Sequence, residues 1–302
     1  MQFSKRSFLK TTIAASAGIS LFHKSLFANI LRTKSPFKMS SIRNNVGLFT
    51  ERGGTIGWMI SENGIVVVDT QFPEQSVHLI DEIKKQSGRK IDLLINTHHH
   101  GDHSGGNISF KGITNMLLAH ENSRKNQVRV AKEQNKEETQ LYPDTTFVKT
   151  WSNIIGEETI TLRYFGPAHT DGDSITHFEN ANIVHMGDLV FNRRFPYIDK
   201  SAGASIKNWI VVLEKTMKLF DRDTIFIFGH AGDGYDIQGS LDDVKAKKNY
   251  LDALLGHVSA EISSGKSEED IMKIQSIKGA NEWQGRGIER NLSAAYMELT
   301  KQ

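Results

Sequence analysis

The sequence contains no cysteine among its 302 residues. That absence excludes disulfide bonds, thiolate nucleophiles, thiolate metal ligands and a lipid attached to an amino-terminal cysteine. Any metal ion must therefore be held by histidine and carboxylate side chains. A ligand set of this kind suits zinc, with iron and manganese as alternatives.

The sequence also lacks a strong charge of either sign. Its formal net charge is +2, and its basic residues are spread along the chain and form no stripe with aromatic residues. These features exclude a typical nucleic-acid-binding protein and a protein that binds membrane surfaces by charge. Apolar residues at 38% and charged residues at 24% are ordinary for a globular protein that buries one large core or two small ones.

Long hydrophobic runs are missing as well, and the short apolar run near the amino terminus reads as an export signal. Lys5 and Arg6 precede residues 11–22, which are too few to span a bilayer as a mature helix. The start resembles the twin-arginine motif with Lys5 in place of the first arginine, so twin-arginine export and general secretion both remain open. Cleavage near Ala28 would release residues 1–28 and leave a bacterial periplasmic or secreted protein without stable membrane insertion. A disordered basic tail and an uncleaved anchor are the alternatives.

Potential metal ligands cluster in one short stretch of the chain. An apolar run at residues 91–96 has strand character, and a turn-forming run follows at 104–107, so the stretch between them lies in a loop at the end of a buried strand. A solvated patch of surface histidines is the alternative interpretation. The cluster consists of His98, His99, His100, Asp102 and His103.

The spacing within this cluster suits two metal ions. Side chains two apart in an extended chain share a face, so His98 and His100 can bind one ion while His99 points away. Asp102 and His103 follow a glycine, which lets them turn toward a second ion.

Three further strand ends carry ligand-type residues. His169 follows an expected strand at 159–165, Asp188 follows one at 182–186, and His230 follows one at 224–228. Glycine or proline lies beside each of them and lets the backbone turn sharply. Each residue alone would indicate an ordinary turn or loop. Their recurrence beside the histidine cluster indicates a metal centre.

Both halves of the chain show strands first and helices after. This order favours an α/β fold built as a four-layer αββα sandwich over residues 46–302, with 29–45 as a linker and 121–140 as an exposed helix or a mobile insertion. The other expected strands are 46–50, 55–60, 65–68, 116–119 and 174–178, and the expected helices are 74–87, 205–220, 241–264, 267–275 and 288–300.

The order His98-x-His100-x-Asp102-His103, followed by His169, Asp188 and His230, resembles the metallo-β-lactamase fold metallo-hydrolase superfamily. The resemblance covers roughly residues 46–235 and is to the binuclear branch typified by glyoxalase II and acyl-homoserine lactonases. It implies two mixed β-sheets flanked by helices. Class B1 lactamases differ in using cysteine near the position of Asp188, and class B3 lactamases differ in lacking the bridging carboxylate.

The resemblance also implies roles for these side chains. His98, His100 and His169 would bind the first zinc ion, Asp102, His103 and His230 the second, and Asp188 would bridge the two. A hydroxide shared by the ions would attack a carbonyl carbon, with Asp102 as the catalytic residue that orients the hydroxide or handles the proton. The implied function is an exported dinuclear zinc-dependent hydrolase that cleaves an ester, thioester, lactone or amide bond in a small-molecule substrate.

Other polar residues near these motifs are candidates for supporting roles. Asn192, Arg193 and Tyr197 follow Asp188 closely and are expected at the mouth of the site, where they would bind a carboxylate or orient a carbonyl; a solvated loop is the alternative. Ligand imidazoles usually donate their second N–H to a carboxylate or carbonyl. The candidates for that role, each equally suited to a turn, are Asp69, Asp171 and Asp173.

Three alternative functions remain at this point. One is a metallo-β-lactamase proper, and another is a mononuclear iron dioxygenase on the same fold, which the complete second ligand set disfavours. The third is a non-enzymatic periplasmic metal-binding or accessory protein, which would bind metal without turnover.

Overall fold

The computed structural model describes residues 37–300. The expected export signal at 1–28 and residues 29–36 of the expected linker lie outside the described residues. Among the helices within this range, none has both the length and the apolar character needed to cross a bilayer.

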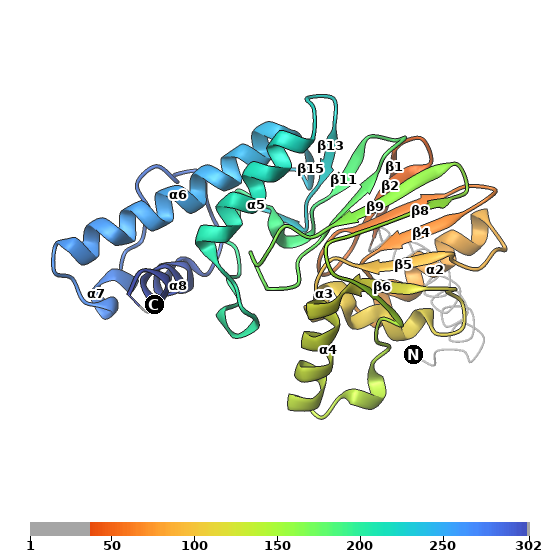
Figure 1. The fold of residues 1–302 in the computed structure, drawn as a ribbon, viewed down its shortest axis with the longest axis horizontal. Coiled ribbons are helices and arrows are strands. Elements are labelled where there is room, and N and C mark those ends of the chain that lie inside the picture. Colours follow the sequence, from red (N-terminus) through yellow and green to blue (C-terminus); the bar gives the residue numbers. More distant parts are fainter. Residues whose placement is uncertain (1–36, 301–302) are drawn as a thin grey trace, which may run out of the picture. The chain divides into compact units, whose positions relative to one another are not determined.

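Seven strands form the first sheet, in the spatial order β1-β2-β3-β4-β5-β6-β7 (Figure 1). Neighbours from β2 to β4 pair antiparallel and neighbours from β4 to β7 pair parallel. The strands are β1 (Lys38–Arg43), β2 (Val46–Thr50), β3 (Ile56–Ile60), β4 (Ile65–Val68), β5 (Leu93–Asn96), β6 (Leu117–His120) and β7 (Thr145–Phe147).

The second sheet has six strands in the order β15-β13-β11-β10-β9-β8. Strands β11 and β13 pair parallel, and the other neighbours pair antiparallel. Its strands are β8 (Thr150–Ile155), β9 (Glu158–Arg163), β10 (Ile175–Phe178), β11 (Ile183–His185), β13 (Ile225–Ile227) and β15 (Gln238–Gly239). A separate parallel pair joins β12 (Phe191–Asn192) to β14 (His230–Ala231).

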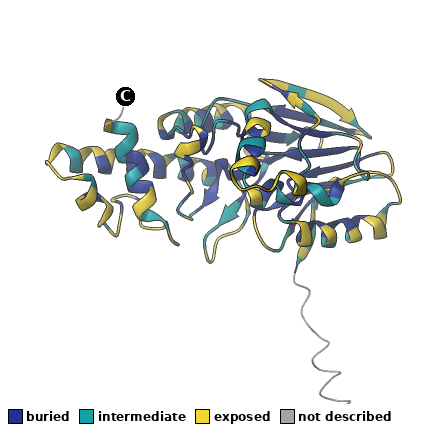
Figure 2. Ribbon diagram, turned by 90° about the horizontal axis from the view of Figure 1, so that it is seen from below, coloured by how far each residue is buried: buried dark blue, intermediate teal, exposed yellow. Residues whose placement is uncertain are grey.

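Alternate residues of the strands build two different cores. Val66 and Val68 of the first sheet pack with Ile183 and Ile227 of the second, so one core lies between the sheets. Val184, next in the chain to Ile183, points the other way into a second core that lies under helices. Figure 2 shows the strands of the sheets mostly as buried and the helices with exposed residues along one side.

Helices complete the outer layers. On the side of the second sheet, α5 (Ile206–Leu219) and α6 (Leu241–Ser263) pack on each other and α8 (Ile288–Thr300) packs on α6, with α7 (Glu268–Met272) against α8. On the side of the first sheet lie α2 (Pro73–Gln86) and α4 (Glu121–Glu133) (Figure 1). Two mixed sheets flanked by helices confirm the predicted αββα sandwich.

The structure contains strands that the sequence-based expectation lacks, namely β1, β7, β8, β12, β14 and β15. Residues 38–43, placed in the linker, form the edge strand β1, and β7 and β8 were not expected at all. Strand β8 is an edge strand with mostly exposed side chains, so it carries no run of buried apolar residues. Residues 121–133 form the helix α4, whose buried face is largely polar and includes Asn126 and Gln127. Its apolar periodicity is therefore weak.

Candidate metal centre

Four turns at the ends of strands bring the candidate ligands to one place. His98 follows β5, Asp188 lies in the 3-10 turn Gly187–Leu189 after β11, and His230 begins β14. His169 lies in the loop between β9 and β10. The parallel pairing of Phe191 with His230 places the chain after Asp188 beside the chain after β13. Sheet register therefore positions these side chains together.

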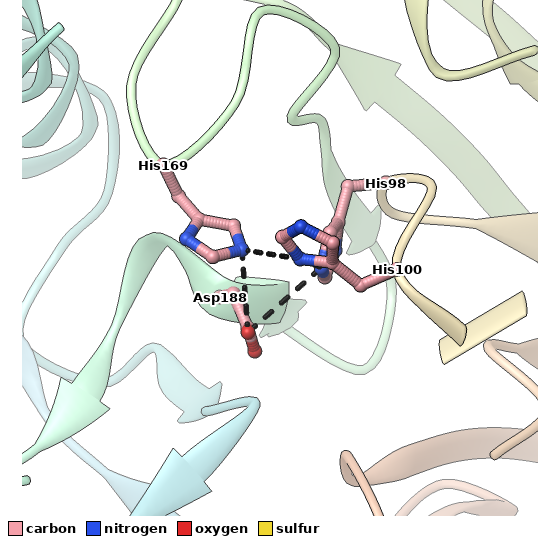
Figure 3. Close-up of side chains that lie close together, drawn as sticks. All are labelled: His98, His100, His169 and Asp188. Carbon is pink, nitrogen blue, oxygen red and sulfur yellow. Dashed lines mark hydrogen bonds and ion pairs between the residues drawn. The ribbon is translucent and has the colours of Figure 1, made fainter. Parts of the chain in front are cut away.

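One group of ligands consists of His98, His100, His169 and Asp188 (Figure 3). His100 Nδ1 lies 3.0 Å from His98 Nε2 and 2.9 Å from His169 Nε2. Asp188 Oδ2 lies 3.8 Å from His98 Nε2 and 3.4 Å from His169 Nε2. Four nitrogen and oxygen atoms thus face one point in the interior.

A second group consists of Asp102, His103 and His230. The two histidine Nε2 atoms lie 3.5 Å apart, and Asp102 Oδ2 lies 3.2 Å from His230 Nε2. The other oxygen of Asp188, Oδ1, lies 3.1 Å from His103 Nε2 and 3.5 Å from His230 Nε2. One carboxylate therefore turns one oxygen to each group, which is the geometry of a bridge.

For three of the ligand histidines, a hydrogen bond on the far side of the imidazole fixes which nitrogen carries the proton. His169 Nδ1 donates to the carbonyl oxygen of Tyr197 at 2.6 Å, and His100 Nε2 donates to Asp199 Oδ2 at 2.9 Å. His103 Nδ1 donates to Asp69 Oδ2 at 2.7 Å. In the neutral tautomers, the nitrogens of these rings that face the centre therefore carry no proton and present a lone pair.

This arrangement fits metal cations. Nitrogen lone pairs that face each other at about 3 Å repel one another unless a cation lies between them. Asp188 Oδ1 is buried and makes no hydrogen bond of good geometry within the described residues, so it lacks a partner that a cation would provide. For tetrahedral zinc with bonds of about 2.0–2.1 Å, neighbouring ligand atoms lie roughly 3.3 Å apart, and the distances in the first group bracket that value.

The charge states of the ligands agree with a cation site. Burial lowers the pKa of His98 well below its usual value and lowers the pKa of His169 to about 3, so both imidazoles are neutral. Burial opposes charge on His103 and Asp188 too. The attraction between the positive His103 and the negative Asp188 outweighs the effect of burial. It raises the pKa of His103 and lowers the pKa of Asp188. A proton on His103 compensates Asp188, and a metal ion would have to displace that proton.

Residues outside the ligand set orient the imidazoles. Of the three aspartates considered for this role, only Asp69 has a hydrogen bond to a ligand histidine among the described contacts; its Oδ2 also accepts from Thr97 Oγ1 at 2.7 Å. Asp171 accepts from Asn126, and Asp173 closes a turn with Thr170. Sequence reasoning missed Asp199, whose carboxylate holds His100, and it named Tyr197 for its side chain and not for the carbonyl that holds His169.

The carboxylate of Asp199 supports a first prediction. Hydrogen bonds from His100 and Ser201 outweigh burial and lower the pKa of Asp199, so it is an anion that holds the His100 ring. We expect Asp199→Ala to weaken zinc binding at the first group by roughly 10- to 100-fold, measured by competition with a chromophoric chelator. Ser201→Ala is the control because Ser201 bonds only the other oxygen, Oδ1. Equal losses in both variants would contradict the role.

The three residues predicted to bind substrate have different surroundings. Asn192 is buried and donates to the carbonyl oxygen of Asp236, and Arg193 donates to Asp243 Oδ1 and pairs with Glu282. Their polar groups thus join β12 to neighbouring segments. A role of these two residues in substrate binding stays a prediction. Tyr197 is half exposed, and its ring centroid lies 5.3 Å from that of His100.

His99 belongs to neither of the two ligand groups, although its ring centroid lies 4.4 Å from that of His100. Its side chain is buried, lines a cavity of about 570 Å³ between the histidine loop and α4, and lies 3.7 Å from Asp199 Oδ2 through Nε2. Burial lowers its pKa to about 3, so it is neutral. Together with His100 and Asp199 it forms a third set of ligand-type atoms, which lie within 4.8 Å of one another.

Sequence comparison places this chain among related hydrolases. A family model described as the metallo-beta-lactamase superfamily matches residues 50–256. The type 2 metallo-beta-lactamase of Elizabethkingia meningoseptica is 24% identical over 216 residues, which cover 68% of this chain and 84% of the relative. The type 2 metallo-beta-lactamase of Bacillus cereus is 23% identical over 249 residues, which cover 79% of this chain and 93% of the relative.

Solved structures share the fold. A double mutant of the sec-alkyl sulfatase PisA1 is similar with a TM-score of 0.68 at 12% identity, over 87% of this chain and 50% of that chain. A metallo-beta-lactamase from Pontibacter korlensis is similar with a TM-score of 0.58 at 18% identity, over 72% of this chain and 99% of that chain. The chain thus spans half the length of the sulfatase and nearly the whole of this lactamase.

Proposed function

The chain belongs to the metallo-beta-lactamase superfamily and is a metal-dependent hydrolase, and on that premise we propose a dinuclear zinc enzyme. It cleaves an ester, thioester, lactone or amide bond in a small molecule. The observation that carries the proposal is the orientation of Asp188, whose two oxygens each face a separate group of ligand atoms.

The described side chains suit this chemistry. Zinc bound at the two groups supplies Lewis acidity, which acidifies bound water and polarises the scissile bond. The rings of His103, His100 and His169 are fixed from behind by Asp69, Asp199 and the Tyr197 carbonyl, so their inner nitrogens would bind metal once the His103 proton is displaced. The chain contains no cysteine, so no thiolate is available as a nucleophile.

Asp102 is the carboxylate we propose for proton handling. Its side chain is 30% exposed, whereas that of Asp188 is 3% exposed, so Asp102 can meet both substrate and solvent. Burial acts to raise its pKa, but His103 and His230 outweigh it and lower the pKa to about 2. The carboxylate is therefore ionised at neutral pH and can orient a water molecule and accept its proton.

A β-lactam is a specific amide substrate that the relatives favour. The curated relatives quoted above are named as type 2 metallo-beta-lactamases, and this chain covers 84% and 93% of their lengths. A lactamase proper is therefore the second candidate. The sulfatase similarity adds alkyl sulfate esters to the substrates worth testing, because it extends over more of this chain than the lactamase similarity does.

Metal analysis combined with a hydrolysis screen tests the proposal. Purified protein should contain close to two zinc ions per chain and should lose turnover on chelation, with recovery after zinc is restored. The screen compares nitrocefin, lactones, thioesters, phosphodiesters and alkyl sulfates. Iron with oxygen consumption would indicate a dioxygenase, and metal without turnover on any substrate class would indicate an accessory protein.

Tyr197 gives a prediction about substrate binding. Its side chain lines a cavity of about 350 Å³ with Met272, Met297 and Arg290, while its carbonyl oxygen holds His169. Tyr197→Ala keeps the carbonyl and removes the ring, so we expect unchanged zinc content and a KM raised about tenfold, since one buried aromatic contact is lost. Leu219→Ala, at a side chain of similar exposure, 47% against 45%, should leave KM unchanged. Loss of zinc in Tyr197→Ala would argue for a structural role.

We propose export on the basis of residues 1–28. The basic start and the short apolar run suit a bacterial signal, and a periplasmic or secreted location follows from it. Fractionation of cells that express the full chain tests this, and a cytoplasmic full-length product would contradict it.

A further inference from the structure

Lys247 of α6 is a buried lysine without a polar partner. Its side chain is 0% exposed, and its Nζ atom makes no hydrogen bond to any described residue. It belongs to the interior where α5 and α6 meet the second sheet. Lysine is almost never fully buried unless it is paired, so this position breaks a general rule of protein interiors.

Four aromatic rings surround the amino group instead. Nζ lies 4.3 Å from the ring centroid of Trp209 and 5.1 to 5.5 Å from those of Trp283, Tyr250 and Phe191. Aromatic faces carry negative potential and attract a cation within about 6 Å. We call the side chains of Phe191, Trp209, Tyr250 and Trp283 the aromatic cage. The cage favours the ammonium form of Lys247.

Two rings of the cage also pack against histidines of the candidate metal centre. The Phe191 ring stacks on His230 with centroids 5.2 Å apart and lies 5.6 Å from His169. The Trp209 ring lies 5.8 Å from His169, and its Nε1 donates to the carbonyl oxygen of Leu189, the residue after Asp188. The same rings therefore contact Lys247 on one side and ligands of both groups on the other.

Packing alone does not explain a lysine here. Burying a charge costs more free energy than burying an apolar side chain of similar volume, and replacing such a charge by an apolar residue is often neutral or stabilising. Methionine has nearly the same length and would fill the cage. Violations of this kind are expected at functional sites, and the metal centre is the nearest one.

We propose that Lys247 is a positioning residue of the metal centre, whose caged ammonium places a fixed positive charge behind the ligand histidines and weakens cation binding there. The proposal rests on the metal centre described above. Burial lowers the pKa of Lys247 well below that of an exposed lysine, while the Asp188 carboxylate acts to raise it. The four aromatic rings that face Nζ also favour the cation, and we infer that these two effects together keep the proton on the amino group. In the cation-free protein the ammonium attracts Asp188. Once cations bind, the same charge repels them through an interior that screens little.

Zinc titration of the cation-free protein tests this proposal. We compare the wild type with Lys247→Met and with Lys245→Met, the latter removing an exposed lysine two residues away on the same helix. Affinity is measured by competition with a chromophoric chelator. Lys247→Met should bind zinc about tenfold more tightly and unfold at a higher temperature, because a buried charge has been removed. Lys245→Met should match the wild type within twofold.

Unchanged or weaker zinc affinity in Lys247→Met would overturn the proposal. If that variant does not fold, the ¹⁵N NMR signal of the Lys247 side chain in the wild type decides instead: an ammonium signal supports the caged charge, and an amine signal overturns it. Absence of zinc binding in all three proteins would instead refute the metal centre itself, so the two failures are distinguishable.

Discussion

Replacement of Asp188 by alanine should remove nearly all bound zinc and lower turnover by at least three orders of magnitude. Asp188 Oδ2 faces His98 and His169, and Oδ1 faces His103 and His230. Removing one carboxylate therefore takes a ligand from both groups at once and leaves buried nitrogens without a counter-charge. Loss of a partner in a buried charged pair costs about 3–5 kcal/mol, so the cation-free fold should also be less stable.

The measurement is zinc content by mass spectrometry together with turnover on whichever substrate the screen identifies. Asp144→Ala is a suitable control, because it removes an aspartate that accepts a hydrogen bond from the backbone amide of Leu117 but lies outside the centre. The control should keep both zinc and turnover. An Asp188→Ala protein that retains two zinc ions and normal activity would remove Asp188 from the bridge.

The ligands could be found from sequence because each one stands at a strand end beside glycine or proline. The apolar strand before His98 and the Gly-Asp and Gly-His pairs at Asp188 and His230 are short patterns within one segment. These strands belong to two sheets, β5 to the first and β9, β11 and β13 to the second, so local patterns predicted which side chains lie at strand ends, whereas the packing of the two sheets brings them together. The two sheets and their outer helices were predicted from the order of strands before helices in each half of the chain, and the mixed character of the sheets was implied by the family resemblance.

The partners of these ligands could not be found this way, since they lie far away in sequence. His100 and Asp199 are 99 residues apart. The partner of His169 is a backbone carbonyl, at Tyr197, and a carbonyl carries no sequence signal. The same holds for Lys247, whose cage is drawn from β12, α5, α6 and the loop before α8. A lysine in a helix predicts an exposed side chain.

For Asn192 and Arg193, the sequence could not predict the direction in which the side chains point. Closeness to Asp188 in the chain predicted a place at the mouth of the site, but the direction of the chain after Asp188 is set by parallel pairing of β12 with β14. That pairing turns Arg193 toward Asp243 at the start of α6, at a distance of 2.8 Å. Proximity in sequence does not determine which way a side chain points.

Gly229→Ala should disrupt the centre through sterics alone, without removal of any ligand. A Cβ atom at this position would lie 2.0 Å from Asp188 Oδ1 and 2.9 Å from the carbonyl oxygen of Gly187. The Asp188 carboxylate or the backbone beside it must move, which changes the geometry of the bridge. We expect zinc affinity to fall by about 100-fold and the fold to lose about 1–3 kcal/mol, as typical for an overpacked interior.

Gly88→Ala supplies the matched control for this steric argument. A Cβ atom there meets no described atom within 4 Å, so the variant should keep its zinc and gain up to about 1 kcal/mol of stability, since alanine restricts the unfolded chain. Chelator competition and thermal unfolding measure both effects. Because every ligand is retained in Gly229→Ala, a loss of zinc there but not in Gly88→Ala would show that the position of Asp188 matters, and not only its presence. Normal zinc affinity in Gly229→Ala would mean that the loop adapts and that the bridge needs no rigid backbone behind it.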